Sequence, residues 1–124
     1  MLRRFIISAG HAALGIIHAF KHERHFRFHC FAVVPVVAAG VYVGLSPVAW
    51  GLVVITMGFV LAAELVNTAL ERLGDLAAHG ERNALSGLAK DIAAGAVLVA
   101  AVAAAVVGVV VVLVPLIRKV FGIN

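Results

Sequence analysis

Three long apolar stretches, at residues 30–45, 48–73 and 87–117, constrain the fold of this chain more than any other feature. The first approaches, and the other two exceed, the roughly 18 to 20 apolar residues that an α-helix needs to cross a bilayer. Of the 124 residues, 64% are hydrophobic and 13% are charged, and the mean hydropathy is +1.12. A soluble chain of this size has too much surface to hide so much hydrocarbon. We therefore predict one all-α integral membrane domain over residues 1–124, with three transmembrane helices.

The segment 1–29 differs from these stretches because basic side chains interrupt its Phe, Ile and Ala residues. This composition is typical of an amphipathic helix that lies at the membrane interface. No small-residue cleavage site follows a short apolar core, so we expect no signal peptide. A turn at Ser46 and Pro47 joins the first two spans, and a polar loop at 74–86 joins the last two.

The positive charge of the chain, a net +4, follows the membrane pattern and does not indicate a nucleic-acid partner. Eight of the ten Lys and Arg residues lie in the segment 1–29 or in and beside the polar loop. Because Lys and Arg favour the cytoplasmic side, we expect the amino terminus and the polar loop in the cytoplasm, with Arg118 and Lys119 opposite. The small residues of the third stretch allow close helix packing and favour a homo-oligomer.

Acidic side chains are few, and four polar residues of the second span form a pattern. Glu64, Asn67, Glu71 and Asp75 are spaced by three, four and four, which places them within roughly 80° on one helix face. Glu64 lies inside the apolar stretch, where an ionisable group costs at least ~2.5 kcal/mol and should face protein, water or ligand. Such a carboxylate suits a general base, and carboxylates nearer the surface suit Mg²⁺. The alternative is a polar seam that only specifies helix packing.

Lys90 and Asp91 begin the third span on the same side. Lys90 can neutralise a phosphate, and Asp91 can orient Lys90 or share a metal; the alternative is a charged helix end whose lysine extends to the headgroups. The chain has no GxxxxGK[ST] and no GxGxxG motif, so a nucleotide site would be of an unorthodox kind.

These residues together resemble the prokaryotic diacylglycerol kinase and undecaprenol kinase family. The resemblance covers about residues 4–110 and rests on E-x-x-N-[ST]-A-[LI]-E-x-x-x-D from Glu64 to Asp75, A-K-D at 89–91, and an upstream E-x-x-hydrophobic-R-x-H from Glu23 to His29. It implies a homotrimer of three-span subunits in the bacterial cytoplasmic membrane, with active sites shared between subunits. It further implies that ATP and Mg²⁺ are used to phosphorylate a lipid hydroxyl at the cytoplasmic face.

The resemblance also implies roles for single residues. Glu64 corresponds to the general base, and Glu23 and Glu71 correspond to carboxylates that hold the metal. His29 matches the undecaprenol kinase branch, since the other branch has an acidic residue there, and so favours undecaprenol over diacylglycerol. The other positions surround the nucleotide and its phosphates: Asn67, Asp75, Lys90 and Asp91, with Arg4 and His11 from the interfacial segment and Glu81 and Asn83 from the loop.

Five histidines form a second pattern, at His11, His18, His22, His25 and His29. On one unbroken helix they would share a face that can bind Zn²⁺ or another transition metal. The resemblance instead implies a break near His25 that divides them. Because the histidine pattern could also bind a metal, the alternative to a kinase is a non-catalytic helix bundle with a metal-binding or assembly role.

Overall fold

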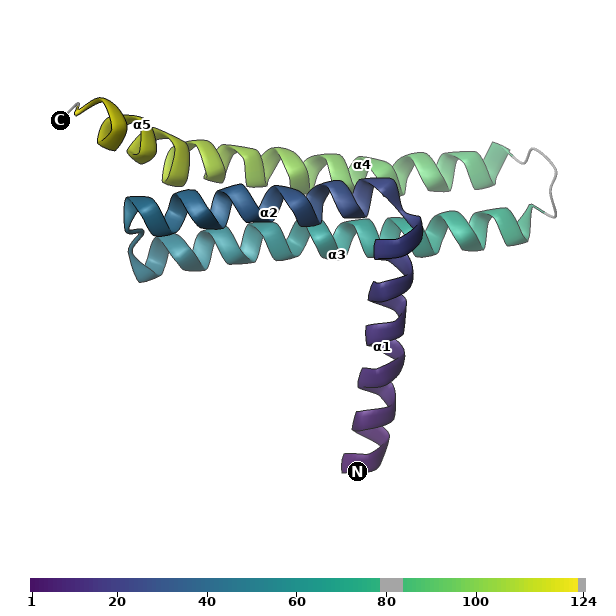
Figure 1. Ribbon diagram of the computed structural model, residues 1–124. Helices are drawn as coiled ribbons and strands as arrows, with labels where there is room; N and C mark the ends of the chain where they lie inside the picture. The colour runs from purple at the N-terminus through teal and green to yellow at the C-terminus, as the bar shows by residue number, and fades with distance from the viewer. Residues whose placement is uncertain (79–83, 123–124) are drawn as a thin grey trace.

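The structure, a computed structural model, describes residues 1–78 and 84–122, and all regular secondary structure in them is helical. The elements are α1 (Leu2–His22), α2 (Arg24–Val43), α3 (Pro47–Ala77), α4 (Ala84–Val107), the π-helix η1 (Gly108–Leu113) and α5 (Val114–Phe121). The helices α2 and α3 and the continuous α4–η1–α5 run lengthwise together, and α1 leaves them at a steep angle (Figure 1). Three described helical stretches are long and apolar enough to cross a membrane: Arg24–Val43, Pro47–Ala77 and Ala84–Phe121. The predicted all-α membrane fold, with an additional amino-terminal helix, is confirmed.

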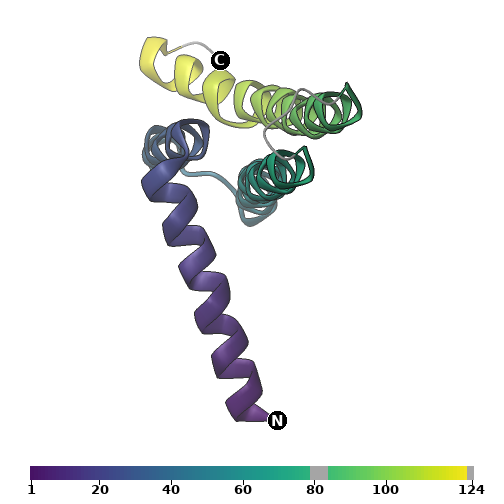
Figure 2. The ribbon, with the colours of Figure 1, turned by 90° about the vertical axis from the view of Figure 1, so that its right-hand side faces the viewer.

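The three spans pack as a triangle when viewed along the bundle (Figure 2). The helices α3 and α4 are the most closely associated pair, whereas α2 packs on α3 and meets η1 and α5 at its far end. The buried apolar side chains between the spans are mainly small ones, such as Val53, Val60, Ala93 and Ala100. Most large apolar side chains point outward, which is expected where lipid or further protein surrounds the bundle.

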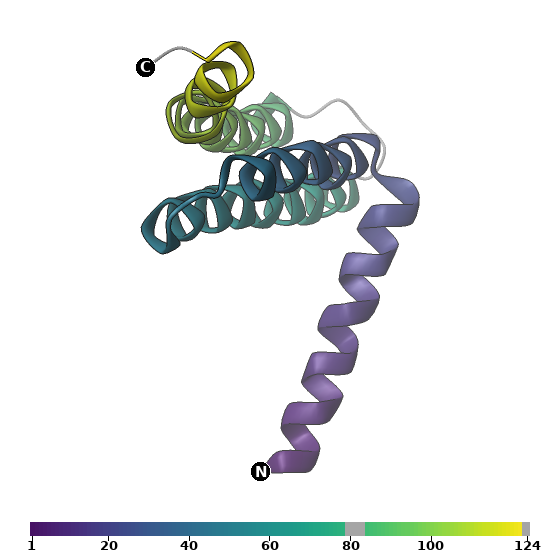
Figure 3. The same ribbon diagram turned by 60° about the vertical axis from the view of Figure 1, so that its left-hand side comes forward.

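The chain turns a corner at Glu23, so the predicted helix over 1–29 ends earlier, at His22. Glu23 is extended, with φ −102° and ψ 116°. The guanidinium of Arg27 donates to the carbonyls of Lys21 at 2.8 Å and Phe20 at 3.5 Å. Carbonyls at a helix end lack partners within the helix, so Arg27 stabilises the end of α1 from the first turn of α2. The helix α1 then projects to one side of the bundle, as an interfacial helix would (Figure 3).

The turn between α2 and α3 contains the predicted residues Ser46 and Pro47. Gly44 closes α2 with a positive φ of 80°, and the Leu45 N–H donates to the Gly40 carbonyl at 3.2 Å. This is the Schellman arrangement, for which glycine is the preferred residue. Ser46 Oγ accepts a backbone N–H at 3.3 Å to cap α3, and Pro47 occupies the first helical turn.

Helix boundaries at the loop end differ from the predicted ones. The helix α3 continues to Ala77 rather than ending at residue 73, and α4 begins at Ala84 rather than 87. The prediction placed the ends where apolar residues stop, but backbone hydrogen bonds do not depend on side-chain polarity. Both helices therefore extend beyond the apolar stretch that predicted them.

Pro115 does not end the third span, which continues past the predicted residue 117 to Phe121. The π-helix η1 precedes it, and the Val114 N–H is bonded to the Val109 carbonyl, five residues back. Pro115 lies at the start of α5, where a missing N–H costs least.

Candidate functional site

The polar face of α3 becomes more exposed from the interior of the bundle toward the loop. Because α3 is one continuous helix, Glu64, Asn67, Glu71 and Asp75 lie along a single face. Glu64 is 6% exposed and Asn67 9%, whereas Glu71 is half-buried and Asp75 is exposed. The stripe therefore joins a buried carboxylate to the surface at the loop end.

The buried carboxylate faces a histidine from another helix. His29 Nε2, on the second turn of α2, lies 3.3 Å from Glu64 Oε1, and the two side chains are 22% and 8% exposed. The sequence singled out His29 as a family position and as a member of the histidine row. The tertiary structure adds its pairing with Glu64.

Asn67 and Glu71 form the next contact along the face. The Asn67 amide Nδ2 donates to Glu71 Oε1 at 2.9 Å. The amide oxygen of Asn67 is buried, and no described residue donates to it. Buried polar atoms in folded proteins are nearly always hydrogen-bonded, so this oxygen marks a place for a donor from outside the described chain.

Glu23 reaches the same end of the bundle from the α1–α2 corner. Its Oε1 accepts from the Arg72 guanidinium at 2.7 Å, and the pair is 22% and 63% exposed in the same order. Arg72 follows Glu71 directly in the sequence, so the contact brings Glu23 to the stretch of α3 that also carries Glu71. Arg72 was not among the predicted site residues, although it is the one basic residue of the predicted second span.

The helices α3 and α4 meet at Gly74. Lys90 pairs with Asp75, and Ser86 Oγ donates to the Gly74 carbonyl at 2.9 Å. A Cβ on Gly74 would lie 2.9 Å from Ser86 Oγ and 3.0 Å from Lys90 Cε. Glycine therefore permits the close approach that allows Lys90 to reach Asp75. Asp75 and Lys90 were predicted site residues, whereas Gly74 and Ser86 were not, since small residues at helix contacts carry no signal of chemistry.

Other predicted site residues lie elsewhere. Arg4 and His11 are exposed on α1, which extends away from the bundle (Figure 1). Asp91 is exposed on the second turn of α4. Glu81 and Asn83 lie outside the described residues.

The corner at Glu23 divides the five histidines, two residues before the break that the resemblance implied. His11, His18 and His22 lie on α1, and His25 and His29 lie on α2. The rings of His18 and His22 are 4.4 Å apart, but the described residues contain no group of three or more His, Cys, Asp or Glu placed to share a metal ion. The groups of the α3 face are carboxylate and amide oxygens, a set that suits Mg²⁺ better than a transition metal.

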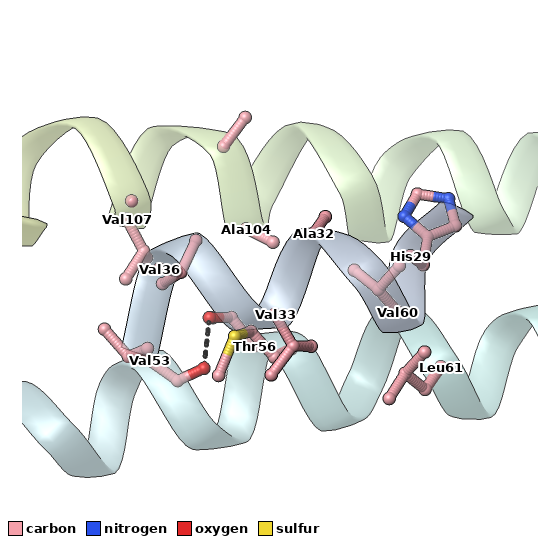
Figure 4. A pocket seen from close by; sticks show the side chains of 13 residues that line it. His29, Ala32, Val33, Val36, Val53, Thr56, Val60, Leu61, Ala104 and Val107 are labelled. Atoms are coloured by element: carbon pink, nitrogen blue, oxygen red, sulfur yellow. Dashed lines mark hydrogen bonds between the residues drawn. The ribbon is translucent and has the colours of Figure 1, made fainter. Parts of the chain in front are cut away.

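A cavity of about 210 Å³ lies between α2, α3 and the α4–η1 segment. His29 stands at one end of it, and Val53 and Val107 stand toward the other (Figure 4). The lining is apolar apart from His29 and Thr56, and the Thr56 hydroxyl is already bonded to the carbonyls of Leu52 at 2.9 Å and Val53 at 3.1 Å. The cavity therefore suits a hydrocarbon whose polar end lies beside His29.

With three candidate spans, a carboxylate face at one end and an apolar cavity beside it, the chain is a small multi-span membrane protein with an acidic site. It belongs to the prokaryotic diacylglycerol kinase family, whose model matches residues 10–112. The predicted family is confirmed, and it supports a lipid kinase in a bacterial membrane.

Three relatives show how the family divides. The chain is 40% identical over 112 residues to a diacylglycerol kinase of Synechocystis sp. (strain ATCC 27184 / PCC 6803 / Kazusa), covering 90% of this chain and 64% of that protein. It is 38% identical over 112 residues to an undecaprenol kinase of Bacillus subtilis (strain 168), covering 90% of each. It is 32% identical over 99 residues to a diacylglycerol kinase of Haemophilus influenzae (strain ATCC 51907 / DSM 11121 / KW20 / Rd), covering 80% of this chain and 83% of that protein. The chain thus spans less than two thirds of the Synechocystis protein and most of the other two.

Proposed function

We propose that the chain is a kinase that transfers the γ-phosphoryl group of ATP to the hydroxyl of a membrane lipid alcohol. The observation that carries this proposal is the buried Glu64, which faces His29 at the polar end of an apolar cavity. A lipid whose chain enters the cavity would present its hydroxyl next to this carboxylate. Membership of a family with lipid kinase names supports the same activity.

Phosphoryl transfer requires positioning and charge neutralisation more than covalent chemistry from the protein. In our proposal Glu64 takes the hydroxyl proton, and the free amide oxygen of Asn67 accepts from a bound ligand. Lys90, held by Asp75, neutralises phosphate charge at the loop end, with Asp91 nearby in sequence. Glu23 and Glu71 are the carboxylates that would hold Mg²⁺, which neutralises phosphate charge when bound.

We propose a homotrimer whose active sites are completed by a second subunit. Within residues 1–78 and 84–122, two basic side chains, Arg72 of α3 and Lys90 of α4, form ion pairs beside the α3 polar face, each with a carboxylate. A triphosphate needs more positive charge than this, and Arg4 and His11 lie on a helix that extends away from its own bundle. The same helix could reach the site of a neighbouring copy. In our proposal Glu81 and Asn83, which lie between α3 and α4 in the sequence, contact the nucleotide.

We place the site on the cytoplasmic side of the bacterial inner membrane. The polar face of α3 opens toward the end of the bundle where α1 joins α2, and in the sequence eight of the ten Lys and Arg residues lie in the segment 1–29 or in and beside the polar loop. At the opposite end, the Lys119 ammonium contacts the carbonyl and the ring of Tyr42, beside the α2–α3 turn. The excess of basic residues at the site end supports this orientation.

We favour undecaprenol as the lipid. Diacylglycerol has two ester groups close to its hydroxyl, and these would need partners that an apolar lining does not supply. A polyprenol has a single hydroxyl on a hydrocarbon, and His29 at the end of the cavity suits that single polar group. Diacylglycerol is the second candidate, because two of the three relatives are named for it.

Transfer of radiolabelled phosphate from ATP, with Mg²⁺ present and both lipids offered side by side, tests the proposal. We expect label in undecaprenol phosphate. Label mainly in phosphatidic acid would retain the mechanism and replace the substrate. A folded oligomer that labels neither lipid would favour a non-catalytic membrane module.

A further inference from the structure

We propose that His29 is a positioning residue that holds the Glu64 carboxylate through its Nε2–H and so aims the second carboxylate oxygen at the acceptor hydroxyl. This inference rests on the proposed lipid kinase activity. It concerns a contact between α2 and α3, which the spacing of polar residues along α3 does not predict.

The two atoms that face each other indicate the direction of the hydrogen bond. His29 Nε2 is the ring nitrogen that faces Glu64 Oε1, at 3.3 Å. An ionised carboxylate only accepts hydrogen bonds, so the contact is attractive only if Nε2 bears the hydrogen. The separation is longer than a typical hydrogen bond, and contacts of this kind commonly shorten when substrate enters the site.

Burial makes this contact important for Glu64. The Glu64 side chain is 8% exposed, and within the described residues His29 Nε2 is the polar group found in contact with its carboxylate. Two basic side chains near this face have other partners, since Arg72 of α3 binds Glu23 and Lys90 of α4 binds Asp75. A buried carboxylate without a hydrogen-bonding partner could adopt other rotamers or bind solvent.

The position of His29 at the end of the cavity indicates where the substrate hydroxyl would approach the pair. His29 lines the polar end of the cavity, while Glu64 itself is not part of its lining (Figure 4). A hydroxyl at the end of a bound hydrocarbon therefore meets the imidazole first, and the carboxylate lies 3.3 Å beyond its Nε2. With Oε1 held by the ring, Oε2 has its lone pairs available for the hydroxyl proton.

The test compares His29→Gln with His29→Leu in the full-length protein in lipid–detergent micelles. Glutamine places an amide N–H near the position of Nε2, and leucine fills similar space without a donor. Because a hydrogen bond to a charged group is lost, we expect the leucine variant to lower kcat by roughly 10- to 100-fold. We expect the KM for ATP to stay unchanged and the glutamine variant to recover most of the turnover.

The matched control is His25→Leu, which makes the same change one turn earlier on α2 at an exposed position. It should leave kcat unchanged. If His29→Leu retains full turnover, or if a folded His29→Gln is as slow as His29→Leu, the positioning role is wrong.

A double-mutant cycle distinguishes an effect of His29 through Glu64 from a general loss of folded protein. If His29 acts through Glu64, adding His29→Leu to Glu64→Gln should cause no further loss of the residual rate. An additional loss as large as that in the wild-type background would assign His29 a role that does not depend on Glu64.

A spectroscopic measurement separates this inference from the kinase proposal. In protein with isotope-labelled histidine, the His29 ring signals, identified by their absence in His29→Gln, should show hydrogen on Nε2 and should shift in Glu64→Gln. Wild-type protein that shows this coupling but transfers no phosphate would refute the kinase and retain the contact. Phosphate transfer without the coupling would retain the kinase and refute the positioning role.

Discussion

Polar groups at the two ends of the bundle are satisfied in different ways. At the α2–α3 turn, the Gly44 and Leu45 amides and the Ser46 hydroxyl bond to nearby backbone, and the Lys119 ammonium contacts the Tyr42 carbonyl and ring. At the loop end, side chains pair with side chains from other helices, and the Asn67 amide oxygen has no described donor. The polar groups named at the turn end have hydrogen-bond partners within the chain, whereas the loop end keeps a buried acceptor, the Asn67 amide oxygen, for a ligand. Each of the following experiments tests this difference.

Glu64→Gln should have the largest effect. The amide keeps the shape of the side chain but cannot take a proton, so we expect kcat to fall by about 10²- to 10⁴-fold. The measurement is phosphate transfer to the preferred lipid, with oligomer size and helical circular dichroism as controls for folding. Unchanged turnover would remove Glu64 from the role of base and would weaken the distinction between the two ends.

Lys90→Gln should have a smaller and more selective effect. The Lys90–Asp75 pair is largely exposed, at 32% and 70%, so its loss should change the free energy of unfolding by less than about 1 kcal/mol. If Lys90 neutralises a phosphate, the KM for ATP should rise about tenfold or more. Steady-state kinetics with ATP varied at saturating lipid measures this, and a rise in the lipid KM alone would contradict the assignment.

Two glycines provide a matched pair across the bundle. A Cβ on Gly40 would lie 2.8 Å from the Trp50 ring, which is rigid, so Gly40→Ala should destabilise the fold by about 1–3 kcal/mol. A Cβ on Gly74 meets the flexible end of Lys90 and the Ser86 hydroxyl, which can move. We expect Gly74→Ala to change stability little but to lower activity.

Thermal unfolding in micelles and phosphate transfer, measured on both glycine variants, separate the two effects. The comparison fails if Gly40→Ala loses activity without losing stability, or if Gly74→Ala is the less stable of the two.

Ser46→Ala should have the smallest effect. Loss of the Ser46 cap on α3 should reduce stability by about 1 kcal/mol, because one amide at the helix start loses its acceptor. Turnover at a temperature where the protein stays folded should be unchanged. A clear decrease in kcat would show that the turn end is coupled to the site.

The pattern within single helices was readable from the sequence. The length of the apolar stretches predicted three spans, because the thickness of a bilayer fixes how long a crossing helix must be. The spacing of Glu64, Asn67, Glu71 and Asp75 predicted one polar face, since the helical repeat fixes which residues align. Ser46 and Pro47 indicated the turn through their local preferences. The catalytic, metal-binding and nucleotide-binding roles of all the predicted site residues remain predictions.

Contacts between helices depended on the tertiary structure. The pairs His29–Glu64, Glu23–Arg72 and Lys90–Asp75 each join two segments whose relative rotation and register no single-helix repeat encodes. The corner at Glu23 depends on Arg27, which bonds the end of one helix from the start of the next. The sequence therefore determined which residues share a helix face, through the period of the helix. Packing decided which faces meet, because interhelical contacts depend on the shapes of both surfaces at once.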